Sequence, residues 1–217
     1  MNLLLKSITS FACIAIVAPA AIGFHLSACV LGSQKVFTGW SQCFSLLPGI
    51  TGAYLRRAFY RLVLPQCGSG VWISFGTIFS QPTAKVGRNV YVGNYCVIGD
   101  VTLEDDVLIA SHVSITNGYE QHGIERLDVP VREQPGRWPH VTIGRDSWIG
   151  ERAVIMADVG RHCVVGAGSV VTKPLPDYAI AVGVPAKIVR YRGDAESQQQ
   201  AVEGLAPEVS LVSKGMS

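Results

Sequence analysis

Aliphatic residues recur at every sixth position through much of the chain. Four clear groups of three are Val86, Val92 and Ile98; Leu103, Ile109 and Ile115; Ile143, Ile149 and Ile155; and Val159, Val165 and Val171. A weaker group precedes them at Cys67, Ile73 and Phe79. Amphipathic helices repeat every three or four residues and strands alternate every two, so a period of six requires a short strand, a turn and a return to the same inward direction. Each group is therefore predicted to form one coil of three short strands.

Glycine follows many of these aliphatic residues, at positions 87, 93, 99, 144, 150, 160 and 166. A residue without a Cβ enters positive φ freely and lets backbones approach closely, so these glycines indicate tight corners. Successive groups are separated by seven residues at Phe79 to Val86, five at Ile98 to Leu103 and four at Ile155 to Val159. The pattern predicts an all-β domain over residues 67–190 whose coils stack into a triangular prism, with one corner shorter than the others.

Residues 1–66 are predicted to form a membrane-associated helical segment. From Ile8 to Gly32 the only ionisable side chains are cysteines and His25, and this length crosses a bilayer as a helix. Pro19 is compatible with such a helix, because lipid-embedded helices tolerate proline. A buried core helix is the weakest alternative, since nothing else in the chain is large enough to cover this segment on all sides.

Basic residues after the apolar stretch indicate its orientation. They are Lys35, Arg56, Arg57 and Arg61, against Lys6 before the stretch. This asymmetry places the downstream chain at the cytoplasmic face of the inner membrane. A cleaved signal peptide ending near Ala18-Pro19-Ala20, or a lipoprotein box at Leu26-Ser27-Ala28-Cys29, is the rival interpretation. Residues 46–65 are predicted to form either an amphipathic helix at the membrane surface or a helix that caps the core.

Composition narrows the class of partner. A formal charge of +2 is too small for dense phosphate neutralisation, so nucleic acid is not an expected partner. The mean hydropathy of +0.31 is high for a soluble domain, and much of the excess lies at the N-terminus. The six cysteines show neither a C-x-x-C pair nor metal-ligand spacing, and they are expected to be reduced thiols. Residues 191–217 are polar and are expected to form a mobile tail.

The repeat is interrupted between Ile115 and Ile143. The intervening segment reads TNGYEQHGIERLDVPVREQPGRWPHVT, which is polar, rich in glycine and proline, and too irregular to form a coil. A loop that leaves the prism is therefore predicted here.

These features together resemble the hexapeptide-repeat acyltransferases, whose fold is a left-handed parallel β-helix. The resemblance covers residues from about Ser69 to Arg190, and it is most specific in VTIGRDSWIGERAVIM and VVGAGSVVTKPLPDYAIAVGVPAKIVR. These runs look like the C-terminal half of the xenobiotic and cell-surface-sugar acetyltransferases. The implied activity is transfer of an acetyl group from acetyl-CoA to a hydroxyl of a sugar or of a cell-surface polysaccharide precursor. Asp158-Val159-Gly160 departs from the family pattern by about two residues.

The resemblance implies that the loop carries an active-site histidine, and His122 stands at the matching place. A neutral imidazole near a hydroxyl takes its proton as the oxygen attacks a thioester, and histidine titrates near neutral pH. The partner that orients the ring is open among Glu120, Glu125 and Asp128. From spacing alone His122 is equally a solvated loop residue. His112 is the second candidate, whereas His140 and His162 are expected at the surface or at corners.

The resemblance also places coenzyme A against the prism and implies a homotrimer that forms the groove between neighbouring chains. The residues expected to bind the cofactor are Trp148, Gly150, Gly166, Ala167, Lys173 and Arg190. Each has a structural alternative: corners for the glycines, packing for Trp148 and solvation for Lys173. No serine or cysteine lies in a recognisable nucleophile motif, which favours direct transfer over a covalent acyl-enzyme.

Three other functions are alternatives to sugar acetylation. A serine or small-molecule acetyltransferase shares the same chemistry, and the sequence identifies neither the acceptor nor the acyl chain length. A γ-type carbonic anhydrase would need three histidines around zinc, yet the position five before His122 is Asn117, so no metal is expected. A membrane-tethered β-helix without activity is the third. The apolar segment favours an acceptor found at the membrane, a lipid-linked sugar.

Overall fold

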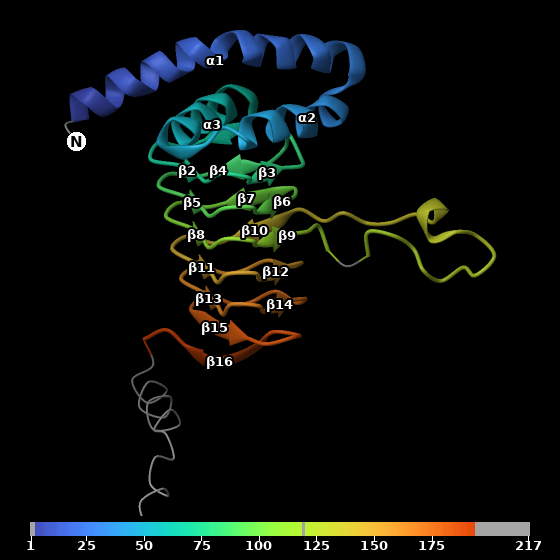
Figure 1. Ribbon diagram of the computed structural model, residues 1–217. Coiled ribbons are helices and arrows are strands. Elements are labelled where there is room, and N and C mark those ends of the chain that lie inside the picture. Colours follow the sequence, from blue (N-terminus) through green and yellow to red (C-terminus); the bar gives the residue numbers. More distant parts are fainter. Residues whose placement is uncertain (1–2, 119, 194–217) are drawn as a thin grey trace, which may run out of the picture.

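The computed structural model describes residues 3–118 and 120–193. Three helices come first: α1 (Leu3–Leu31), α2 (Ser33–Ser45) and α3 (Gly49–Val63). Short strands follow and wind into a stack of coils, with the helices gathered at one end of the stack (Figure 1).

The strands form three sheets, which are the three faces of a prism. Face A contains β1 (Gln66–Cys67), β4 (Lys85–Val86), β7 (Val101–Leu103) and β10 (Val141–Ile143). Face B contains β2 (Trp72–Ile73), β5 (Tyr91–Val92), β8 (Leu108–Ile109), β11 (Trp148–Ile149), β13 (Val164–Val165), β15 (Ala179–Val182) and β16 (Lys187–Tyr191). Face C contains β3 (Ile78–Phe79), β6 (Val97–Ile98), β9 (Ser114–Ile115), β12 (Val154–Ile155) and β14 (Val170–Val171). A 3-10 helix, η1 (Val131–Glu133), lies between β9 and β10.

The strand register confirms the predicted period of six. Within each face the strands of successive coils pair in parallel, so that Val92 stands opposite Ile109 on face B. On face C, Ile98 likewise stands opposite Ile115. The aliphatic residues of the four clear groups are all buried and stack in columns inside the prism. The weaker group belongs to the same stack, because Cys67 pairs with Val86. The predicted fold class, a left-handed parallel β-helix preceded by a helical segment, is confirmed.

Close approach of successive coils explains the glycines that follow the aliphatic residues. A Cβ built on Gly93 would lie 2.6 Å from the carbonyl carbon of Ala110, and one on Gly144 would lie 2.5 Å from that of Gly160. Neither Gly93 nor Gly144 has a positive φ, and most left-handed turn positions are occupied by residues with side chains, such as Asn89 at φ 57°. Of the two reasons for glycine at these corners, backbone crowding is therefore the one that applies.

The short interval before Val159 removes a strand without disturbing the stack. Val159 forms isolated parallel bridges with Ile143 of the preceding coil and Leu175 of the following coil, in place of a regular strand on face A. Its side chain is nevertheless buried with the others. The missing residues shorten a corner and leave the inward column intact.

Helices α2 and α3 cap the first coil, so residues 46–65 supply a capping helix. Arg56 of α3 is buried, and its guanidinium donates to the carbonyl oxygens of Ile73 at 2.9 Å and of Leu47 at 2.5 Å. Burial lowers the pKa of Arg56. Tyr60 and Ser41 share a hydrogen bond of 2.7 Å, and the Ser41 hydroxyl accepts one from the backbone N–H of Phe79. These contacts fix both helices to the prism.

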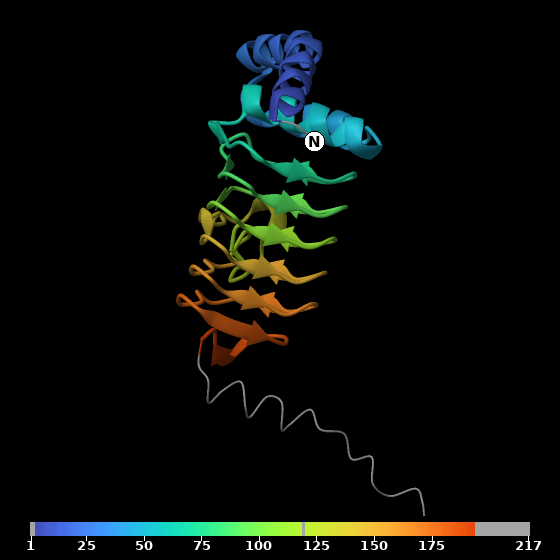
Figure 2. The same cartoon turned by 90° about the vertical axis from the view of Figure 1, so that its left-hand side faces the viewer.

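Helix α1 lies across α2 and α3 and does not continue the axis of the stack (Figures 1 and 2). A stripe at helical spacing, Val17, Ala21 and Phe24, packs against the two helices beneath. The rest of α1 is uncovered: Phe11 is 72% exposed and Val30 is 81% exposed. Residues 9–31 are long and apolar enough to cross a membrane, and only three of them, Val17, Ala21 and Phe24, are buried. This exposure disfavours the core-helix alternative.

The other end of the prism is closed by β16, which turns back antiparallel to β15. Residues 194–217, most of the predicted tail, lie outside the described residues.

Candidate active site

The interruption of the repeat is a long loop that leaves the prism at the corner between faces C and A. It runs from the end of β9 to the start of β10 and extends well away from the stack (Figure 1). Asn117 ties its two ends together and is itself buried. The Asn117 amide donates to the carbonyl oxygens of Asp100 at 2.7 Å and Pro139 at 2.9 Å, and its oxygen accepts from the Asp100 N–H at 2.9 Å. The loop therefore starts from a defined base.

A second buried amide organises the far part of the loop. The Gln134 side chain accepts from the Arg126 N–H at 3.1 Å and donates to the carbonyl oxygens of Arg126 at 2.7 Å and Val129 at 3.1 Å. The Arg137 N–H donates to the Glu120 carbonyl oxygen at 2.7 Å, which joins the outgoing and returning arms. Gly136 is required at this junction, because a Cβ there would overlap the carbonyl oxygen of Gln121.

His122 lies on the outgoing arm beside a hollow of about 400 Å³. The hollow is lined entirely by loop residues, among them Glu120, Glu125 and Arg137. The rings of His122 and Trp138 meet edge to face, with their centroids 6.1 Å apart. Within residues 3–118 and 120–193, His122 has no hydrogen-bond partner, so both ring nitrogens are available to a ligand.

The three carboxylates considered as partners of His122 are not equivalent. Asp128 is held by Arg126, with 2.5 Å between Nη2 and Oδ2, and this hydrogen bond lowers the pKa of Asp128. Glu120 and Glu125 line the same hollow as His122. Of the three, these two therefore remain candidates to orient the imidazole.

A second hollow, of about 450 Å³, lies at the base of the loop. It is lined by Gln34, Gln81, Thr83, Asp100, Asn117 and Trp138. At its edge His140 meets Asp100 with 3.1 Å between Nδ1 and Oδ1, and the His140 Nε2 lies 2.8 Å from the Thr102 hydroxyl. Sequence reasoning missed this cluster, because its members come from α2, two successive corners and the loop. The one sequence feature that could have indicated this cluster is the position of Asp100 at a corner of the repeat.

Three of the predicted cofactor residues stack at the corner between faces B and C. A Cβ on Gly150 would lie 2.5 Å from the Ala167 nitrogen, and one on Gly166 would lie 2.7 Å from Val182. Ala167 is exposed at this corner. Trp148, on the neighbouring β11, points outward and is 51% exposed.

The other three predicted residues lie elsewhere. Lys173 is exposed at the corner after β14, the same edge of the prism from which the loop leaves two coils earlier. Arg190 lies on β16 at the far end of face B, opposite Ile180. None of the six cofactor residues lines the hollow beside His122. A single chain therefore does not bring the predicted base and the predicted cofactor residues into one pocket.

Two of the other histidines, His112 and His162, occupy turns. His112, the second candidate base, is stacked on Tyr95 with ring centroids 5.3 Å apart. His162 is stacked on Tyr178, and its Nδ1 lies 2.9 Å from Asp146. This hydrogen bond, together with Arg192, holds the pKa of Asp146 below its usual range. In the described parts of the chain, no three His, Cys, Asp or Glu side chains are grouped as a metal site would require.

A stack of three-stranded coils with a loop at one corner is the architecture of the hexapeptide transferases, and comparison with known proteins agrees. A model of the bacterial transferase hexapeptide, in six repeats, matches residues 83–117 and 140–173. Galactoside O-acetyltransferase of Escherichia coli (strain K12) is 32% identical over 148 residues, which are 65% of this chain and 70% of that protein. The chain belongs to the hexapeptide-repeat acyltransferases.

Two further comparisons place the chain within this family. The putative lipopolysaccharide biosynthesis O-acetyl transferase WbbJ of Escherichia coli (strain K12) is 34% identical over 125 residues, covering 53% of this chain and 61% of that protein. A solved structure of galactoside acetyltransferase in complex with coenzyme A superimposes with a TM-score of 0.63 at 25% identity, covering 73% of this chain and 80% of that one. Neither alignment reaches the whole of this chain.

Proposed function

We propose that this protein transfers an acetyl group from acetyl-CoA to a hydroxyl of a sugar or of a cell-surface polysaccharide precursor, with His122 as general base. The observation that carries the proposal is the open imidazole of His122, which lines one hollow of the loop and meets Trp138, a wall of a second hollow. The named coenzyme A complex of galactoside acetyltransferase supports acetyl-CoA as the donor. The name of the WbbJ relative supports a polysaccharide precursor as acceptor.

Direct transfer needs a single proton shuttle. The imidazole of His122 accepts the proton of the acceptor hydroxyl while its oxygen attacks the thioester carbonyl carbon. The carbon–sulfur bond then breaks, and the imidazolium returns the proton to the departing thiolate. The products are the O-acetylated acceptor and free coenzyme A. Backbone N–H groups are the donors expected to stabilise the oxyanion that forms between these steps.

The hollow beside Trp138 suits a hydroxyl-rich acceptor. Its lining supplies the amides of Gln34 and Gln81, the hydroxyl of Thr83 and the carboxylate of Asp100. Trp138 contributes an aromatic wall and also contacts His122. A sugar presents hydroxyls at its rim and an apolar face to such a ring, so a pyranose placed here would stack on the residue that also meets the proposed base.

Binding of coenzyme A is proposed along the exposed corner of Gly150, Gly166 and Ala167, with Trp148 beside it and Lys173 and Arg190 for the phosphates. Because His122 projects away from these residues of its own chain, the site is proposed to be completed by a neighbouring copy in a homotrimer. The outer side of face B supports this assembly. Tyr91, Leu108 and Trp148 are adjacent in register there and are 39%, 45% and 51% exposed, an apolar column for a partner to cover.

The acceptor is further proposed to be lipid-linked, with α1 holding the enzyme at the cytoplasmic face of the inner membrane. The uncovered apolar surface of α1 supports this location.

The test measures release of the coenzyme A thiol from acetyl-CoA with a panel of nucleotide sugars, lipid-linked oligosaccharides and serine. His122→Asn is expected to lower kcat by about 10²–10⁴-fold with some acceptor in the panel, which is the usual contribution of general acid–base catalysis. His112→Asn is the matched control, since asparagine tolerates the left-handed backbone at φ 58° and His112 lies outside the loop. Turnover by His122→Asn at the wild-type rate would remove His122 from the mechanism.

A further inference from the structure

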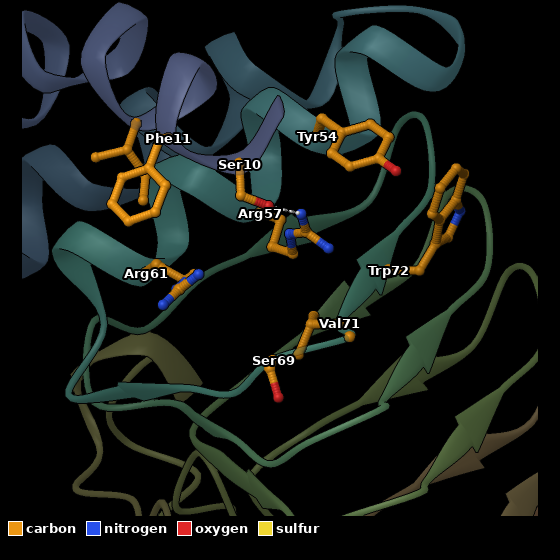
Figure 3. Close-up of a pocket in the computed structure, with 10 residues that line it drawn as sticks. Ser10, Phe11, Tyr54, Arg57, Arg61, Ser69, Val71 and Trp72 are labelled. Atoms are coloured by element: carbon orange, nitrogen blue, oxygen red, sulfur yellow. Dashed lines mark hydrogen bonds between the residues drawn. The ribbon is translucent and has the colours of Figure 1, made fainter. Parts of the chain in front are cut away.

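A cavity of about 650 Å³ lies away from the loop, where α1 and α3 meet the first coil (Figure 3). Its walls include Phe11 and Ile14 from α1, Arg57 and Arg61 from α3, and Trp72 from β2. None of these residues lines the hollows beside His122 and Trp138. The cavity is therefore separate from the proposed active site.

The cavity contains two positive charges without a negative partner. In Figure 3 both guanidinium groups extend from α3 into the space above Ser69 and Val71. Arg57 donates to the Ser10 hydroxyl at 2.8 Å and lies over the Tyr54 ring, 4.9 Å from its centroid. Arg61 is exposed, and its guanidinium has no hydrogen bond or ion pair with any residue in 3–118 or 120–193.

Among residues 9–118 and 120–193, no aspartate or glutamate lines this cavity. The nearby thiol of Cys67 does not balance the arginines either, because burial raises the pKa of Cys67 to about 12 and keeps it neutral. Two guanidinium groups that share one cavity bind an anion with several acceptor oxygens best, and phosphate has that geometry.

The remaining walls are apolar and continue into the surface of α1. Phe11 and Ile14 belong to the apolar stretch of α1, where Phe11 is largely exposed. Tyr54 and Trp72 meet edge to face, with ring centroids 6.3 Å apart. Tyrosine and tryptophan are the residues that collect where a bilayer meets water, and arginines below an apolar helix attract anionic headgroups. The ligand that matches this arrangement joins a phosphate to hydrocarbon.

We propose that the cavity binds the phosphate headgroup of an anionic membrane lipid between Arg57 and Arg61, with the acyl chains lying along Phe11 and Ile14. The lipid then acts as an anchor of defined geometry, because it is held by the helix α3 that caps the prism. The orientation of the prism relative to the bilayer follows from this contact as well as from α1.

The probe is phosphatidylglycerol with brominated acyl chains, titrated into the full-length protein in zwitterionic detergent micelles. Bromine quenches tryptophan fluorescence at contact distance, and Trp72 lines the cavity. Saturable quenching is expected. The difference between the wild type and Trp72→Phe gives the part of the quenching that comes from Trp72. Arg57→Gln and Arg61→Gln are each expected to raise the half-quenching concentration about tenfold, through loss of a charge-assisted hydrogen bond.

Lys35→Gln is the matched control, because Lys35 is an exposed cation on α2 outside the cavity. Its titration should follow the wild type within about twofold, the scale of a single screened surface charge. An equal effect of Lys35→Gln and Arg61→Gln would overturn the proposal in favour of general attraction to the membrane. Equal quenching by brominated phosphatidylcholine would show that no anion is selected.

Inorganic phosphate separates a lipid site from a site for a soluble anion. The proposal requires that phosphate at the lipid's own half-quenching concentration displaces little of the brominated lipid, whereas displacement at that concentration would contradict it. Since Arg61 has no partner in the described chain, Arg61→Gln is not expected to unfold the protein, and its thermal midpoint checks this. The readout is binding alone, so its failure would leave the acyl transfer proposal untouched.

Discussion

Single residues with unusual surroundings hold the helical cap to the prism. Tyr60 is fully buried, its hydroxyl lies 2.7 Å from that of Ser41, and burial raises the pKa of Tyr60 to about 12. Arg56 satisfies carbonyl oxygens at the turn between α2 and α3 and at the end of β2. Such buried polar groups favour one position of the helices on the prism, because each loses its hydrogen bonds if the helices shift.

The raised pKa of Tyr60 predicts a loss of stability in alkali. The phenol stays neutral in the folded state while the unfolded phenol ionises near its ordinary pKa of 10.0. The stabilising contribution is therefore complete below pH 10 and is lost as pH rises toward 12, by roughly 2–3 kcal/mol in total. Tyr60→Phe should flatten the fall of the thermal midpoint between these pH values, whereas Tyr91→Phe on exposed β5 should keep it. A parallel fall in all three proteins would refute the assignment to Tyr60.

Among the elements, the loop between β9 and β10 carries the proposed base, and two amides hold its conformation. Asn117 joins its ends and Gln134 joins its distal turns. A loop of this length without such bonds would sample many positions. The bonds give His122 a defined place relative to the prism even though the loop extends far from it.

Asn117→Ala is predicted to loosen the loop without unfolding the prism. The substitution removes three hydrogen bonds at the loop base, a net cost of about 1–3 kcal/mol. Amide hydrogen exchange should accelerate across residues 120–139, and kcat should fall about tenfold through misplacement of the proposed base. Asn94→Ala, at a corner away from the loop, is the control. Unchanged exchange in the loop would show that its base is held by other contacts.

At the scale of the whole molecule, the proposed site depends on more than one chain. The loop points away from its own stack, and face B exposes a column of apolar side chains. Both features are accounted for if the loop of one copy reaches the corner of Gly150 and Gly166 in the next.

Complementation between two defective chains tests this arrangement. One chain carries His122→Ala and keeps an intact groove, and the other carries Trp148→Ala with Lys173→Glu and keeps an intact loop. Random assortment into cyclic trimers should restore about one quarter of the wild-type sites, since only an intact loop facing an intact groove is active. Acetyl-CoA turnover of co-expressed, co-purified chains is compared with each chain alone. No recovery would mean that the loop and the groove of one chain work together.

The order of residues was sufficient to predict the prism, because a period of six is a local property that each strand and corner repeats independently. Val92 and Ile98 point inward wherever the coil is placed, and the position of the loop follows from the gap in the same period. The crowding that requires Gly93 is equally regular.

Contacts between distant segments could not be predicted from the period. The bond from Asn117 to Pro139, the meeting of His140 with Asp100, and the cavity between Arg57 and Phe11 each join parts of the chain whose spacing follows no period. Their geometry depends on how the loop and the helices pack, since packing energy is gained only when the segments come together in the folded chain.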